Sequence, residues 1–188
     1  MTIRTLILAA ALIAAPPAAV AQQADPGAVA AQKAAIARID IVDGTWRGEA
    51  VQRMPDGEHR VTQTERAGSL LDGTIKLIEG RGYNPDGTTG FNAFATIAWD
   101  AAAKAYRMRS YAQGRTIDPN FEMTDNGFIW GFPAGGATIR YTATISGGKW
   151  REIGEYVLPG QPPRQFFEMN LVRIGDSDWP KGSTVPPK

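Results

Sequence analysis

The chain has no cysteine and only one histidine among its 188 residues. Without a thiol it can form no disulfide scaffold, thiolate zinc site, iron–sulfur cluster, cysteine nucleophile or lipid anchor on cysteine. An excess of charge is also missing, because 20 Lys and Arg face 19 Asp and Glu. A nearly neutral chain has no net positive field to attract nucleic acid or an anionic membrane surface. We therefore expect no nucleic-acid partner.

Motifs for conventional catalysis and for metal or phosphate binding are also missing. The single His59 directly follows a Pro-Asp-Gly-Glu turn, where we expect it to be solvated. A lone histidine builds no metal site, and no G-x-S-x-G elbow accompanies it. The glycines at 80–82 and 131–136 do not lie between a strand and a helix, as a phosphate-cradling loop requires. The sequence therefore predicts no catalytic residue, no metal and no cofactor.

The first 21 residues have the features of a secretory signal peptide. Arg4 is the only charge before Asp25, residues 6–15 are wholly apolar, and Ala19-Val20-Ala21 forms an A-x-A cleavage site. We expect cleavage after Ala21 and a periplasmic or secreted mature protein. The ten-residue apolar run is shorter than the about 20 residues that span a bilayer, so we expect no membrane span.

The rest of the chain divides into a helical segment, a strand-rich domain and a tail. Residues 22–43 are rich in alanine and predict one short helix or linker, with Pro26 in its first turn. Residues 44–175 form the domain, and residues 176–188 form a Pro-rich tail. Within the domain, Pro-Asp-Gly, Leu-Asp-Gly and similar turns separate β-prone runs. Ten strands are predicted, at residues 44–54, 59–67, 74–83, 90–99, 105–112, 115–123, 127–132, 137–145, 149–158 and 164–174.

Strands joined by such short turns must be antiparallel, because a parallel crossover needs about a dozen residues or more. The fold class is therefore all-β, and an up-and-down antiparallel β-barrel of about ten strands is the predicted architecture, since closure removes exposed strand edges. A two-sheet sandwich is the alternative. Residues 137–145 alternate apolar side chains with Thr and Arg, as expected where one face of a strand is buried.

Several motifs resemble those of lipocalin-like (calycin) barrels. Gly44-Thr45-Trp46 opens the first strand and Arg173 closes the last one. The similarity extends through the runs at 71–73, 98–100, 106–111 and 128–131. Over residues 35–174 the chain resembles an uncharacterised bacterial exported family with a lipocalin-like domain, for which no activity is established. The resemblance implies that Arg173 lies over the Trp46 ring and closes the barrel structurally, through a cation–π contact.

Haem-binding barrels of the nitrobindin type share the Gly-x-Trp opening. They bind haem through a histidine late in the chain, and the last predicted strand here has none. We therefore expect no haem.

An apolar ligand cavity is expected inside the barrel. Trp130, Tyr141 and Phe167 lie on predicted apolar strand faces and would line it. Arg109 and Tyr111 share one strand face, and together, or failing them Arg140, they would hold an anionic group through guanidinium and phenol donors. The expected function is to bind a small, mainly apolar molecule with an anionic end, and the expected partner is a hydrophobic or amphiphilic ligand.

Two other functions stay open from the sequence. A barrel enzyme (isomerase, cyclase or hydrolase) could use arginine with a carboxylate among Glu65, Glu79, Glu122, Glu152 and Glu168, although each carboxylate is expected to point outward. Two titratable groups facing each other inside the barrel would favour this enzyme. A solidly filled barrel would instead favour a non-catalytic envelope interaction protein. The sequence leaves the oligomeric state open.

Overall fold

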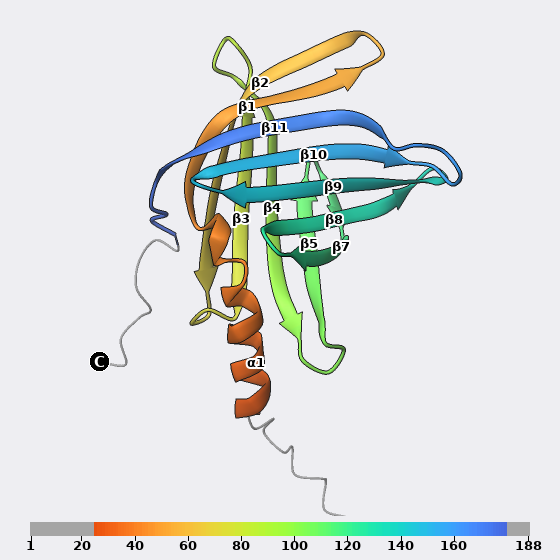
Figure 1. Cartoon of the computed structure of the whole chain (residues 1–188). Coiled ribbons are helices and arrows are strands. Elements are labelled where there is room, and N and C mark those ends of the chain that lie inside the picture. The colour runs from red at the N-terminus through yellow and green to blue at the C-terminus, as the bar shows by residue number, and fades with distance from the viewer. Residues whose placement is uncertain (1–24, 180–188) are drawn as a thin grey trace, which may run out of the picture.

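The computed structural model describes residues 25–179, an all-β fold with one short N-terminal helix (Figure 1). Helix α1 (Pro26–Ala37) begins where Asp25 accepts hydrogen bonds from the backbone N–H groups of Gly27 and Ala28. Pro26 occupies the first helical turn, as predicted, where its missing N–H costs nothing. The 3-10 helix η1 (Asp40–Val42) leads into the first strand. The predicted signal peptide and the residues after Trp179 lie outside the described residues.

Eleven antiparallel strands follow, and nine of the ten predicted runs correspond to one strand each. Their bounds are β1 (Gly44–Met54), β2 (Gly57–Leu70), β3 (Ile75–Tyr83), β4 (Thr89–Asp100), β5 (Ala105–Ala112), β6 (Arg115–Ile117), β7 (Asn120–Thr124), β8 (Gly127–Ala134), β9 (Ala137–Ser146), β10 (Lys149–Val157) and β11 (Arg164–Gly175). The remaining predicted run, residues 115–123, is divided into β6 and β7 by Asp118 and Pro119. Because proline has no N–H to donate, it interrupts the ladder at this point.

The strands form one curled sheet in the order β6-β5-β4-β3-β2-β1-β11-β10-β9-β8-β7. The first and last long strands pair in the middle of this sheet, and β6 and β7 lie at its two ends. No ladder among the described strands joins those ends, so the sheet is a half-barrel and not the closed barrel expected from the sequence (Figure 1).

Side chains bridge the open seam between β5 and β7. Tyr106 of β5 contacts Phe121 of β7 with ring centroids 5.4 Å apart. Phe121 stacks on Phe128, which meets Trp150, which in turn meets Trp46 on β1. This row of rings lies on the concave side of the sheet, so burial of aromatic surface stabilises the seam in place of backbone hydrogen bonds.

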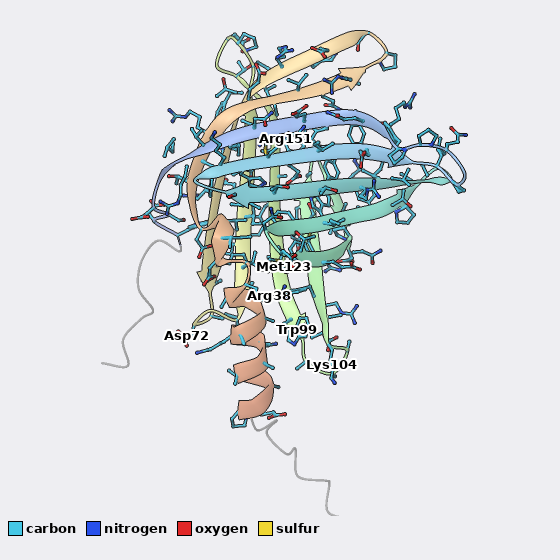
Figure 2. The ribbon with its side chains drawn as sticks, in the orientation of Figure 1. Arg38, Asp72, Trp99, Lys104, Met123 and Arg151 are labelled. Atoms are coloured by element: carbon cyan, nitrogen blue, oxygen red, sulfur yellow. The ribbon has the colours of Figure 1, made fainter. Side chains whose placement is uncertain are left out.

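Helix α1 covers one end of the half-barrel. Gln32 donates to the Trp99 carbonyl, and the Tyr106 hydroxyl donates to the carbonyl of Ala35. The turns that carry Asp72 and Lys104 lie at this same end (Figure 2). We call this the closed end and the opposite one the mouth. No helix in residues 25–179 is long and apolar enough to cross a membrane.

Candidate functional site

Two glutamates lie on the concave face of the sheet, and we call Glu65 and Glu152 the inner acid pair. Glu152 of β10 is in register with Ala143 and Met169, both buried, so strand alternation directs its side chain inward. Glu65 of β2 is in register with buried Trp46 on β1. Curvature of the sheet brings these side chains toward each other across β1 and β11.

Glu152 is almost fully buried, with 7% of its surface exposed. The Trp130 Nε1–H donates to its Oε1 over 3.2 Å. Loss of water raises the pKa of Glu152 to about 7, although the indole N–H groups of Trp130 and Trp150 favour its ionised form. The carboxyl is therefore divided between its two protonation states near neutral pH.

Trp150 Nε1 is a buried donor that forms no hydrogen bond of normal geometry. Its ring is 2% exposed, and its N–H lies near enough to Glu152 to lower the pKa of that carboxyl. An unpaired buried donor costs about 1–3 kcal/mol. The indole N–H of Trp150 is thus a buried donor whose hydrogen bonding is not completed by the neighbouring side chains.

Glu65 accepts one hydrogen bond, from Gln63 Nε2 at 2.7 Å. A Cβ at Gly80 would lie only 2.6 Å from its Oε1, so the glycine on β3 makes room for this carboxylate. Glu65 keeps some solvent exposure, but protein surrounds it on most sides. Desolvation raises its pKa well above the usual 4.5, against the Gln63 hydrogen bond, and the nearby charges of Glu152 and Glu79 raise it further.

Six rings on strands β8 to β11 form what we call the aromatic cluster: Trp130, Phe132, Tyr141, Tyr156, Phe166 and Phe167. Trp130 and Tyr141 stack with centroids 4.2 Å apart and an interplanar angle of 7°. Phe166 and Phe167 contact Tyr141 edge-on, and burial raises the pKa of the Tyr141 hydroxyl. Phe166 is buried and the other five are partly exposed, so the cluster offers ring surface beside Glu152.

Within residues 25–179, no cation forms a hydrogen bond or ion pair with Glu65 or Glu152. Lys76 is the only buried cation in residues 25–179, and it binds Asp40 and Asp43 at the closed end, at 2.8 and 2.5 Å. Arg164 lies over the Tyr156 ring, and its charge shifts the pKa of neither Glu65 nor Glu152.

The arginines of the neighbouring strands form ion pairs on the convex face. These pairs are Arg66–Glu79, Arg140–Glu155 and Arg151–Glu168, with N–O distances of 2.7 to 2.9 Å.

The residues predicted to hold an anion lie on that convex face. Arg109 forms a two-bond pair with Asp118, at 2.7 and 2.9 Å. Tyr111 is 42% exposed and packs against Phe94. Arg140 pairs with Glu155. The interior position expected for Arg109 and Tyr111 is wrong, because Met108 and Ser110 are the buried residues of that strand.

The other predicted residues lie on the concave face. Trp130, Tyr141 and Phe167 all belong to the aromatic cluster, as the alternation of their strands indicated. Trp46 is buried at the closed end and donates from Nε1 to the Val42 carbonyl.

Arg173 is in register with Trp46 but does not lie over its ring. The cation–π contacts in residues 25–179 join Arg66 to Trp179 and Arg164 to Tyr156. Arg173 instead donates to the Asp43 carbonyl and pairs with Asp176. The expected stacking is thus replaced by a polar contact with the backbone that precedes β1.

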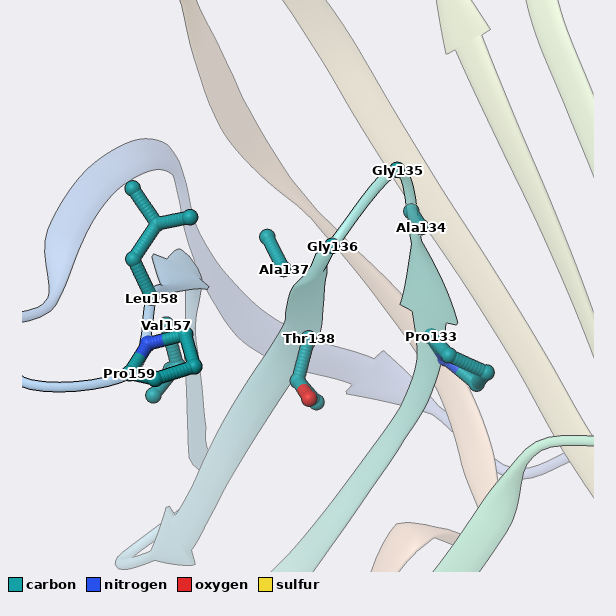
Figure 3. Close-up of a pocket in the computed structure, with 9 residues that line it drawn as sticks. All are labelled: Pro133, Ala134, Gly135, Gly136, Ala137, Thr138, Val157, Leu158 and Pro159. Atoms are coloured by element: carbon teal, nitrogen blue, oxygen red, sulfur yellow. The ribbon is translucent and has the colours of Figure 1, made fainter.

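Residues 25–179 contain two surface depressions, and Glu65 of the inner acid pair is among the residues that line the second. One of about 490 Å³ lies between the β8–β9 turn and the end of β10, and no charged side chain lines it (Figure 3). The other, about 330 Å³, is lined mainly by polar residues of β1, β2 and β3, among them Arg47, Arg66 and Arg81. Within the described part of the chain, no group of three or more acids and histidines could hold a metal ion.

Sequence reasoning assigned Glu65 and Glu152 to the outside. The alternation of β10 nevertheless contained the signal for Glu152, since it shares a face with Trp150, Gly154 and Tyr156. Glutamate is rarely buried in proteins, so its residue type favours an outward position even where strand alternation indicates an inward one.

No protein-family model matches the chain, and neither does any curated protein sequence. The fold is similar to the crystal structure of Rv2717c from M. tuberculosis, with a TM-score of 0.56 and 10% identity. That match covers 74% of this chain and 97% of the other. At this identity the similarity shows a shared fold alone.

Proposed function

We propose that the protein is an exported lipocalin-like carrier that binds a small, mainly apolar molecule against the aromatic cluster. The observation that carries this proposal is the incomplete hydrogen bonding of Trp150, next to Glu152. The Trp150 N–H forms no hydrogen bond of normal geometry, although it lies near Glu152 in an interior where unpaired donors are rare. Partly exposed rings above a few convergent polar groups are typical of small-molecule sites.

The polar end of the ligand would meet carboxyl groups and indole N–H groups. An anionic end, as expected from the sequence, would find no buried arginine, because Arg109 and Arg140 pair with acids on the convex face. It would also be repelled by the ionised form of Glu152. We therefore drop the anionic end from the proposal and keep the apolar body.

An acid–base enzyme is a second candidate, favoured by the inner acid pair. Two carboxyls near each other, one protonated and one ionised, supply a general acid and a general base at neutral pH. Glu152, with a pKa near 7, would transfer the proton in an isomerase, cyclase or hydrolase. Turnover of a bound molecule that stops in Glu152→Gln would identify this activity.

A matched pair of tyrosine variants tests the binding site. The neutral probe N-phenyl-1-naphthylamine should gain fluorescence on binding and quench tryptophan emission, since Trp130 lies in the cluster. Tyr141→Leu should weaken binding about fivefold, because a stacked aromatic contact is worth about 1 kcal/mol. Tyr111→Leu, on the convex face, should leave the affinity within about twofold.

Equal losses in the two variants, or a loss only in Tyr111→Leu, would place the site elsewhere. Absence of probe binding to the wild-type protein would refute an apolar site. Native mass spectrometry of protein purified from its own envelope should, in parallel, detect a co-purified small molecule.

A further inference from the structure

Buried carboxylates usually pair with a cation, and in the described part of the chain neither Glu65 nor Glu152 does so. Glu152 receives a hydrogen bond from an indole and Glu65 receives one from an amide, and neither donor carries charge. Lys76, the one buried cation of the described region, is bound to Asp40 and Asp43. Because a buried charge is stable only when paired, this site lacks a positive partner.

We propose that the missing partner is part of the ligand: an organic ammonium group that binds between Glu65 and Glu152. The inference rests on the binding function proposed above and names its ligand class, an amine with an aromatic or alicyclic body. Trp130 and Tyr141 stack on each other beside Glu152, and both rings keep partly exposed surface. Rings around a carboxylate are the usual surroundings of a bound ammonium, since their faces attract positive charge.

Trp150 supplies an independent observation about the same ligand. Its buried Nε1–H faces Glu152 but forms no hydrogen bond of normal geometry, so an oxygen of the ligand would complete its bonding. An ether, hydroxyl or carbonyl oxygen two or three bonds from the nitrogen would accept this hydrogen bond while the ammonium meets the carboxylate. The ligand class is therefore an oxygen-bearing amine, not a simple alkylamine.

Binding should also move a proton. Near neutral pH the inner acid pair retains a proton because its carboxyls are desolvated and repel each other. Among the described residues, Glu79 lies near Glu65 and Tyr141 lies near Glu152, and neither side chain supplies a positive charge. When an ammonium arrives, it takes the place of this proton, which passes to the buffer. Calorimetry in buffers of different ionisation enthalpy measures that release directly.

Four probes of nearly equal shape test the inference: 2-phenoxyethylamine, 3-phenylpropylamine, 2-phenoxyethanol and phenoxyacetate. The first should bind at least about tenfold more tightly than the neutral alcohol and the anion, with proton release at pH 7. It should also bind several-fold more tightly than 3-phenylpropylamine, which lacks the oxygen. Affinities are measured by calorimetry and by tryptophan quenching.

Two glutamine variants on the same strand locate the effect. Glu152→Gln should reduce the preference for amine over alcohol to about twofold or less and abolish proton release. Glu155 pairs with Arg140 on the convex face, so Glu155→Gln should keep both the preference for the amine and the proton release. Binding of neutral 2-phenoxyethanol serves as the folding control in each variant.

The outcomes separate the two proposals. If 2-phenoxyethanol or phenoxyacetate binds as tightly as the amine, the cation inference is overturned while the binding function stands. The cation inference is likewise overturned if the amine preference survives Glu152→Gln. If neither the naphthylamine probe nor any of the four compounds binds, both proposals fail.

Discussion

Replacing Glu152 by glutamine should stabilise the protein, and by an amount that depends on pH. The side chain is 7% exposed, and its folded-state pKa is about 7 against an ordinary 4.5. At about 1.4 kcal/mol for each tenfold change, this difference corresponds to about 3 kcal/mol. Glutamine keeps an oxygen to accept the Trp130 N–H but never ionises.

The sign follows from proton linkage. Because folding raises the pKa of Glu152, the folded state binds the proton more tightly than the unfolded state does. Wild-type stability therefore falls as pH rises through the window from about 4.5 to 7, while Glu152→Gln lacks this loss. The variant should equal the wild type near pH 4 and exceed it by about 3 kcal/mol at pH 8.

Urea denaturation at a series of pH values, with the slope checked for constancy, gives the free energies of unfolding. Glu168→Gln is the matched control. Hydrogen bonds from Asn170 and Gln165 and the Arg151 pair lower the pKa of Glu168. The wild type therefore gains stability from Glu168 as pH rises, and Glu168→Gln should become less stable than the wild type over that range. A Glu152→Gln effect that is flat with pH, or destabilising at pH 8, would refute the assignment of a desolvated interior carboxyl.

Three further substitutions should destabilise the fold, each measured by urea denaturation at pH 7. Lys76→Met should cost about 2 kcal/mol because it leaves Asp43 without its cation, and adding Asp43→Asn should recover part of the loss. Arg173→Ala should cost about 1 kcal/mol, through lost hydrogen bonds at the closed end, without changing probe affinity; no change in stability would contradict this. Gly48→Ala should cost about 2 kcal/mol or more, because the new Cβ would lie 2.0 Å from the Asn170 carbonyl oxygen; wild-type stability would show that the backbone yields freely.

Much of the strand pattern was predictable because it is local. The runs at 44–54 and 105–112 match β1 and β5 residue for residue. Glycines in the intervening turns adopt positive φ, among them Gly57 and Gly73, and such residues are recognisable without any tertiary contact. The prediction for 115–123 was wrong in one respect, since Pro119 divides that run and opens the sheet.

The direction of polar side chains was less predictable. On β5 the pattern separates Arg109 and Tyr111 from Met108 and Ser110 but does not say which set faces inward. Tyr111 places an aromatic ring beside Arg109 on one face, and Ser110 places a hydroxyl beside Met108 on the other. Each face therefore combines a side chain typical of the interior with one typical of the surface. Burial of Met108 and Ser110 decided the direction, and Arg109 pairs outside with Asp118.

The sequence by itself determined the antiparallel order of hairpins, the helix that begins at Pro26 and the apolar faces that include Trp130, Tyr141 and Phe167. These features depend on turn chemistry and on a period of two, which act over a few residues. Only the tertiary structure decided that β6 and β7 do not pair with each other and that Glu65 and Glu152 approach each other. Those two residues are 87 positions apart and lie on strands separated by β1 and β11, so their proximity depends on the curvature of the whole sheet.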